Sequence, residues 1–479
     1  MKDQENNLIR KAYEEIKKKQ HLVKKDPYRL KFHIMPPVGL LNDPNGWIDY
    51  KGRYHLFYQW NPFKTAHGAK FWGHYSSVDL VHWETEPIAL APSDWYDKNG
   101  CYSGSAIEHQ GKMYLFYTGN VKDDNGNRET YQCLAISDDG VTFEKHGPVI
   151  HLPEGYTAHF RDPKVWKHGD QWFMIIGAQT VEEKGVAVLF SSKDLWNWNH
   201  IGPIAGNGLQ QLEDFGYMWE CPDLFSMGDK DVLIVSPQGL EPKGDLYQNI
   251  FQTGYLVGKL DYQSGVFKHG SFIELDRGFD FYAPQSTLDH KGRRILFGWM
   301  GMADNEENAH PTVQHEWVHA LTLPRELVLQ NNKLYQKPVS ELTMLRDELH
   351  SFPDYKLEGD HVALPGVDGI IMELNIDQLQ VDEKFEIQFR HAAILQIHPK
   401  INKVSLGRKK FNSTDYEYRH CSISNVGSLD VYLDTSSIEV FINGGEEVFS
   451  ARFYPDPENE EILFSGKAEF HLKKWDLKI

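Results

Sequence analysis

The sequence predicts an all-β protein, in which a five-bladed β-propeller is followed by a C-terminal β-sandwich. Three observations predict this fold: a repeat of glycine and strand, aromatic or β-branched runs after each glycine, and alternating apolar runs beyond the repeat. One unit of about 60 residues accommodates the four antiparallel strands of a propeller blade. Five copies therefore predict five blades, which we place within residues 30–335.

The repeat consists of a glycine followed at once by a short hydrophobic strand. The glycines stand 59, 58, 59 and 64 residues apart, at Gly52, Gly111, Gly169, Gly228 and Gly292. A glycine in this position marks a tight turn between two antiparallel strands. A second element, an aspartate followed four residues later by an aromatic residue, recurs at Asp79, Asp139 and Asp194. Glycine turns are common in β-rich chains, but this near-constant register favours a true repeat.

The segments on either side of the repeat complete the expected domain organisation. Residues 1–29 place apolar side chains at helical spacing among charges and predict an N-terminal helix. Residues 336–348 predict a linker helix. Residues 349–479 predict the β-sandwich, with an alternating strand at 438–442 that runs into the hairpin-turn pair Asn443-Gly444.

Composition excludes several classes of partner. A net charge of −18 leaves no overall basic character for binding nucleic acid or an anionic membrane surface, and an anionic substrate would need a locally basic pocket. The four cysteines include no CxxC pair and fit a reducing compartment. Neither a signal peptide nor a run of roughly 20 apolar residues is recognisable. We therefore expect a cytoplasmic protein.

Three acidic residues occupy the same phase of the repeat. Asp43, Asp162 and Glu220 precede the first, third and fourth repeat glycines by nine, seven and eight residues. If the strand before each glycine is the innermost of its blade, these acids converge at the propeller axis. A proline follows the two aspartates directly and the glutamate at two positions, and it restricts the backbone there. Asp-Pro turns are common, but three acids at one phase favour a function.

Two carboxylates are enough to hydrolyse a glycosidic bond, one as the acid and the other as nucleophile or base. Glu220 follows a tryptophan and precedes Cys221, an apolar setting that favours a protonated acid. Asp43 has the amide neighbours Asn42 and Asn45, which are expected to hold it ionised as a nucleophile.

Eight motifs resemble glycoside hydrolase family 32, the β-fructofuranosidase or invertase family. They are Asn42-Asp-Pro-Asn-Gly46, Tyr58-Gln-Trp-Asn-Pro62, Phe71-Trp-Gly-His74, Tyr102-Ser-Gly-Ser105, Arg161-Asp-Pro163, Glu220-Cys-Pro-Asp223, Asp280-Phe-Tyr-Ala-Pro-Gln285 and Leu321-Thr-Leu-Pro-Arg-Glu-Leu327. The likeness covers nearly the whole chain and is greatest to the bacterial sucrose-6-phosphate hydrolases of that family. It implies a propeller followed by a sandwich, and a retaining reaction through a covalent fructosyl-enzyme on sucrose 6-phosphate, sucrose or both.

The resemblance also implies a role for each matched residue. Asp43 would be the nucleophile, Glu220 the acid/base, and Asp162 the transition-state stabiliser that holds fructose hydroxyls. The implied substrate contacts are Asn42, Gln59, Trp72, Tyr102, Ser103, Arg161 and Tyr282, the last of which would also help set the protonation of the acid/base. The implied partner is a small sugar, with neither a metal nor an organic cofactor, and the sequence is compatible with a homodimer.

One stretch departs from the family pattern. Where many relatives have a tryptophan-glycine pair, this chain has Lys64-Thr-Ala-His-Gly-Ala-Lys70. We hypothesise that His67 and Lys70 help bind a phosphate on the glucosyl 6-position, as an ammonium group can. The alternative is that both are solvated loop residues.

Other functions stay open at this point: an exo-fructanase or fructosyltransferase of the same family, an inverting pentosidase, and a non-catalytic sugar-binding propeller. The paired carboxylates disfavour the last, and the lack of a signal peptide disfavours polymer substrates.

The zinc-protease pattern His315-Glu-Trp-Val-His319 reads as a strand, which would hold its histidines too far apart for one zinc ion. Cys221 has no histidine beside it in sequence and is expected to pack rather than to attack.

Overall fold

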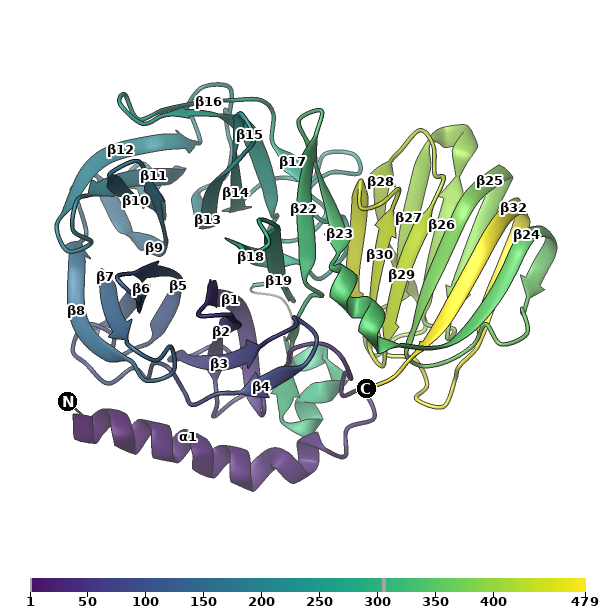
Figure 1. The fold of residues 1–479 in the computed structure, drawn as a ribbon, viewed down its shortest axis with the longest axis horizontal. Coiled ribbons are helices and arrows are strands. Elements are labelled where there is room, and N and C mark those ends of the chain that lie inside the picture. Colours follow the sequence, from purple (N-terminus) through teal and green to yellow (C-terminus); the bar gives the residue numbers. More distant parts are fainter. Residues whose placement is uncertain (1, 304–306) are drawn as a thin grey trace.

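Five mainly antiparallel sheets surround a central axis, and one further sheet of nine strands stands beside the fifth (Figure 1). This computed structural model describes residues 2–303 and 307–479 and confirms the predicted all-β fold. The long helix α1 (Lys2–Val23) lies along the outside of the first blade, where its Ala12 is buried against the core. Within the described ranges, none of the helices has the length and apolar content needed to cross a membrane.

Each blade is one sheet whose strands follow one another in sequence. The first blade contains β1 (Gly39–Tyr50), β2 (Arg53–Asn61), β3 (Phe71–Ser77) and β4 (Trp83–Thr85). The second contains β5 (Cys101–His109), β6 (Lys112–Lys122), β7 (Arg128–Ser137) and β8 (Glu144–His151). The third contains β9 (Tyr156–His168), β10 (Gln171–Thr180), β11 (Gly185–Ser192) and β12 (Trp198–Gly206). The fourth contains β13 (Met218–Met227), β14 (Lys230–Gln238), β15 (Gly254–Asp261) and β16 (Val266–His269), with β17 (Ile273–Glu274) at its edge. The fifth contains β18 (Tyr282–Leu288), β19 (Arg294–Met300), β22 (Arg325–Gln330) and β23 (Lys333–Pro338), with β21 (Ala320–Leu321).

The first strands of the blades form a closed ring. In it β1 contacts β5, β5 contacts β9, β9 contacts β13, β13 contacts β18, and β18 contacts β1. After β19 the chain forms the short 3-10 helices η1 (Glu307–Ala309) and η2 (Pro311–His315) and returns to the first blade. There β20 (Trp317–Val318) pairs in parallel with the start of β1 and joins the two ends of the ring.

The predicted repeat elements occupy equivalent turns of the blades. The five repeat glycines have φ angles of 79, 75, 58, 63 and 77°, in the left-handed region that favours glycine in tight turns. The three repeat aspartates each accept backbone N–H bonds from the residues two and three positions ahead. This Asx-turn arrangement enters the outer strand of a blade. The periodicity therefore reports the blade architecture correctly.

The C-terminal sheet begins after η3 (Ser340–Leu345), a 3-10 helix that lies within the segment expected to form a linker helix. It contains β24 (Arg346–Val362), β25 (Met372–Phe389), β26 (Ala393–His398), η4 (Pro399–Ile401), β27 (Lys403–Lys409), β28 (Tyr416–Ser422), β29 (Leu429–Asp434), β30 (Ser437–Ile442), β31 (Glu447–Arg452) and β32 (Ile462–Leu477). The long strand β25 pairs with β29 through its first half and with β26 through its second. Two layers therefore share β25, and a hydrophobic core lies between them.

Buried ion pairs hold the propeller against this sheet. Arg325 of the fifth blade is fully buried and contacts Glu439 of β30 at 2.6 Å. His33 places Nδ1 2.8 Å from Asp434 and Nε2 3.0 Å from the same Glu439. Burial disfavours the charged imidazole, but the two carboxylates outweigh burial and raise the pKa of His33 to about 9. The junction therefore contains an imidazolium between two carboxylates.

The ionisation of His33 makes the stability of this junction depend on pH. Because the folded-state pKa is raised above the unfolded value of about 6.5, the charge of His33 stabilises the fold below pH 6.5. This contribution, on the order of 3 kcal/mol, is lost as the pH rises toward 9. We expect the wild type to unfold at a higher temperature than His33→Gln at pH 6.5. This difference in unfolding temperature should shrink as the pH rises toward 9. A constant difference across that window would contradict the prediction.

Candidate active site

A β-bulge interrupts the first strand of every blade at the same height. Two residues oppose one in β1, β9, β13 and β18, and one extra residue is inserted in β5. The bulges contain Asp43 in β1, Asp162 in β9 and Cys221 in β13, and Glu220 lies directly before the last. A bulge leaves residues unpaired and turns their side chains out of the regular alternation. Pro163 and Pro222 lie inside their bulges, where there is no ladder bond for proline to remove, whereas Pro44 directly follows the bulge of β1.

Two residues from the first two blades donate hydrogen bonds to Asp43, and a third residue, Gln59, holds these donors in place. The Ser103 hydroxyl donates to its Oδ2 at 2.5 Å, and the Asn42 amide donates to its Oδ1 at 3.1 Å. Gln59 in turn donates to Ser103 at 2.6 Å and accepts from Asn42 at 3.2 Å. Burial raises the pKa of Asp43, and the bonds from Ser103 and Asn42 oppose that rise. The carboxylate is therefore fixed in orientation within a partly dehydrated site.

Cys221 connects the two aspartates. Its backbone N–H donates to Asp162 Oδ2 at 2.9 Å, and its Sγ lies 3.5 Å from that oxygen and 3.7 Å from Asp43 Oδ2. Burial is the main cause that raises the pKa of Asp162, and it also holds the pKa of the Cys221 thiol well above its usual range. A protonated thiol between two acids is a weak donor rather than a nucleophile, which agrees with the expectation for this residue.

Glu220 is surrounded by donors from three blades. Arg161 donates from Nε and Nη2 to Oε1 at 2.9 and 2.6 Å. Tyr282 and Gln238 donate to Oε2 at 2.6 and 2.7 Å. These contacts correct the expectation of an apolar setting for Glu220, because the neighbouring Trp219 is buried in the core on the other face of the strand. Gln238 was not anticipated, since a glutamine at the end of a buried strand carries no sequence signal.

The three acids face one cavity at the mouth of the propeller, with a volume of about 650 Å³. Its wall includes most of the residues predicted to contact substrate: Asn42, Gln59, His67, Lys70, Tyr102, Arg161 and Tyr282. It also includes Lys122, Arg128, His159 and Gln238, which sequence reasoning missed. Residues that lie far apart in the chain thus meet in one site, as the shared repeat phase predicts.

Two predicted contacts lie behind the wall of this cavity instead of on it. Trp72 is fully buried, and its indole N–H donates to the backbone carbonyl of Tyr102 at 3.1 Å. Ser103 is 2% exposed, and its hydroxyl donates a hydrogen bond to Asp43. In this structure Trp72 supports the backbone of Tyr102 and Ser103 orients Asp43, and their direct contact with sugar stays a prediction.

The loop residues His67 and Lys70 line the same cavity as Asp43. Lys70 Nζ is 3.1 Å from His67 Nδ1, and His67 Nε2 is 3.1 Å from a carboxylate oxygen of Glu307. Burial lowers the pKa of Lys70 to about 7, although Asp43 and Glu307 oppose the shift. The pair therefore has carboxylates close by; Lys70 is buried, whereas His67 is exposed to solvent, as the alternative interpretation has it.

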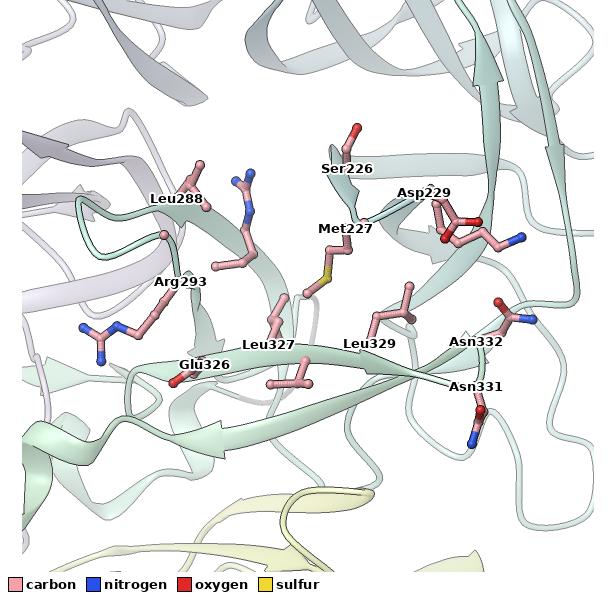
Figure 2. Close-up of a pocket in the computed structure, with 15 residues that line it drawn as sticks. Ser226, Met227, Asp229, Leu288, Arg293, Glu326, Leu327, Leu329, Asn331 and Asn332 are labelled. Atoms are coloured by element: carbon pink, nitrogen blue, oxygen red, sulfur yellow. The ribbon is translucent and has the colours of Figure 1, made fainter.

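A second cavity, of about 570 Å³, lies at the opposite end of the strands and does not resemble a catalytic site. The turn glycines Gly228 and Gly292 line it, so it is remote from the bulges. Its two carboxylates, from Asp229 and Glu326, lie at opposite ends of the cavity (Figure 2). Paired acid chemistry needs carboxylates that face one bond, and this cavity does not provide them.

The zinc-protease pattern is not a single helix. His315 ends η2, the next residue has a left-handed backbone, and β20 follows. His319 lies beyond β20, where it is buried against Trp299 and His310. The predicted strand is therefore confined to Trp317–Val318, and the two motif histidines belong to different elements.

Comparison with known proteins agrees with this geometry. Residues 33–338 match the model of the glycosyl hydrolases family 32 N-terminal domain, and residues 371–478 match that of the family 32 C-terminal domain. The chain is 55% identical to the sucrose-6-phosphate hydrolase of Bacillus subtilis (strain 168), over 99% of each chain. A solved sucrose-6-phosphate hydrolase from Lactobacillus gasseri superimposes with a TM-score of 0.88 at 31% identity, covering 97% of this chain and 96% of that one. A family 32 beta-fructofuranosidase of Bombyx mori, solved in complex with sucrose, gives 0.85 at 36% identity and covers 98% of both chains. The chain belongs to glycosyl hydrolase family 32.

Proposed function

We propose that this protein is a retaining β-fructofuranosidase that hydrolyses sucrose 6-phosphate and also accepts sucrose. The observation that carries the proposal is the meeting of Asp43, Asp162 and Glu220 in one cavity, each held in a defined orientation by neighbouring blades. The names of the relatives, sucrose-6-phosphate hydrolase and beta-fructofuranosidase, support the same substrates.

The first half-reaction forms a fructosyl ester. An oxygen of Asp43 attacks the anomeric C2 of the fructosyl unit, while the bond from C2 to the glucosyl oxygen breaks. Glu220 gives its proton to that departing oxygen, so the glucosyl unit leaves as a neutral alcohol. Asp162 binds fructose hydroxyls and stabilises the positive charge that develops on the ring.

The second half-reaction releases fructose. Glu220, now a carboxylate, takes a proton from water while the water oxygen bonds to C2 and the ester bond to Asp43 breaks. Arg161, Tyr282 and Gln238 hold Glu220 through both steps, because they contact its carboxyl group from three sides. Retention of configuration follows from two displacements at the same carbon.

The proposal is tested by the steady-state kcat/KM of the purified protein on sucrose and on sucrose 6-phosphate. We expect activity on both substrates and a preference of about tenfold or more for the phosphate, which corresponds to about 1.4 kcal/mol. Equal values would indicate a general invertase. Activity on neither, with turnover of pentosides instead, would contradict the proposal. The cytoplasmic location and the homodimer stay predictions.

A further inference from the structure

One wall of the active-site cavity is strongly cationic in a protein of net charge −18. Lys122, at the end of β6, and Arg128, at the start of β7, both line this wall. In the described part of the chain, neither side chain has a carboxylate within ion-pair distance; the guanidinium contacts only His159. The carboxylate of the nearby Asp123 accepts hydrogen bonds from the backbone and the side chain of Asn127. The wall therefore carries two positive charges without a protein counter-charge.

The β-sheet register makes this arrangement costly. Lys122 and Arg128 are directly opposite partners in the antiparallel pair of β6 and β7. Like charges in that position repel and destabilise a hairpin. The backbone of Lys122 is nevertheless anchored, because its N–H donates to the Asn99 side chain at 2.7 Å. A repulsive pair held in place at a cavity wall is expected where a ligand supplies the missing negative charge.

His159 adds a neutral donor to the same wall. Its Nδ1 lies 3.1 Å from Arg161 Nη1 and 3.4 Å from Arg128 Nη1. A guanidinium can only donate, so Nδ1 accepts and the ring proton is on Nε2. Burial, together with the two arginines, lowers the pKa of His159 to about 4, so the ring is neutral near pH 7. The wall thus offers donors of three chemical kinds.

This wall lies on the leaving-group side of the bond to be broken. Contacts run from Arg128 through His159 to Arg161, which binds Glu220. The acid/base must touch the oxygen of the departing glucosyl unit, so that unit lies next to this chain of contacts. The other basic pair, His67 and Lys70, lies instead beside Glu307 and Asp43, whose carboxylates already favour a positive charge on Lys70.

We infer that Lys122 and Arg128, with His159 as an additional donor, bind the phosphate of the glucosyl unit. This inference rests on the proposed function and names the part of the site that would distinguish a phosphorylated disaccharide from a free one. It assigns the phosphate contact to these residues in place of His67 and Lys70. The guanidinium suits two phosphate oxygens at once, and the ammonium supplies a point charge.

The test compares kcat/KM on sucrose 6-phosphate and on sucrose for the wild type, Lys122→Gln, Arg128→Gln and the double variant. We expect each single variant to lower the ratio of the two values by about tenfold, and the double variant to lower it further. The loss on sucrose is expected to be smaller, because free sucrose has no phosphate to lose. Inhibition by glucose 6-phosphate should weaken in parallel, while inhibition by glucose should change little.

Two comparison variants make the result specific. Lys112→Gln removes the same charge from the far end of β6, where the ammonium contacts Asp138, and is expected to leave the ratio unchanged. Lys70→Gln tests the competing assignment. An unchanged ratio in the Lys122 and Arg128 variants, or a fall confined to Lys70→Gln, would overturn the inference. If the wild type cleaves neither substrate, the proposed function itself fails, so the two failures are distinguishable.

Discussion

Replacing Asp43 with asparagine is expected to lower kcat/KM on sucrose 6-phosphate by at least about 10⁴-fold. The amide has nearly the same shape as the carboxylate, so its contacts with Ser103 and Asn42 can largely persist. It cannot form the fructosyl ester, however, and a route without the covalent step has no other nucleophile at that position. The loss should therefore appear in kcat without a change in thermal stability.

The measurement is steady-state kinetics combined with mass spectrometry of acid-quenched samples. A fructosyl adduct is expected on the wild-type peptide that contains Asp43 and not on the variant peptide. Asp170→Asn removes a carboxylate from an exposed turn at the other end of β9 and should retain full activity. An Asp43→Asn protein with more than about one-hundredth of wild-type activity would exclude this residue as the nucleophile.

Replacing Glu220 with alanine is expected to cost about 10³-fold on sucrose 6-phosphate, within the usual range for loss of a general acid/base. The cost should be much smaller in the first step on an aryl β-fructofuranoside, because a phenolate departs without a proton. The second step then lacks its base and becomes limiting. Added azide, a nucleophile that needs no deprotonation, should restore turnover and give a fructosyl azide.

The dependence on the leaving group separates this role from a general disturbance of the site. Removal of Glu220 also leaves Arg161 without its carboxylate partner, so thermal unfolding must accompany the kinetics. Glu326→Ala, in the second cavity, serves as the matched control and should behave like the wild type. Equal losses on both leaving groups, without rescue by azide, would show that Glu220 is not the proton donor.

The architecture was accessible from the sequence because the blade repeat leaves local traces. A turn glycine needs a left-handed backbone and an aspartate caps the entry to an outer strand, so both recur wherever a blade recurs. The same phase brought Asp43, Asp162 and Glu220 together before their contacts were known. A repeat of this kind depends only on residues that are close together in the sequence, so the sequence alone reveals it.

Contacts between blades could not be read in the same way. Gln238 reaches Glu220 from the end of β14, and Trp72 is covered by surrounding core residues, although neither has a neighbour in sequence that predicts its environment. Lys122 and Arg128 flank a polar turn in the sequence, and only the sheet register places them opposite each other at a cavity. The bulges were likewise invisible, because a proline indicates a restricted backbone but not which ladder bond is missing.

The parallel pairing of β20 with β1 has a consequence for how the molecule is made. The first four blades can assemble in the order of synthesis, since their strands pair with neighbours in sequence. The hydrogen-bonded seam between β20 and β1 cannot form until Trp317 has left the ribosome and can meet Gly39. Closing so long a loop is slow and costs chain entropy. A nascent chain stalled before this point would expose the unpaired side of its first blade, so chaperone binding should be strongest there and end abruptly once β20 emerges.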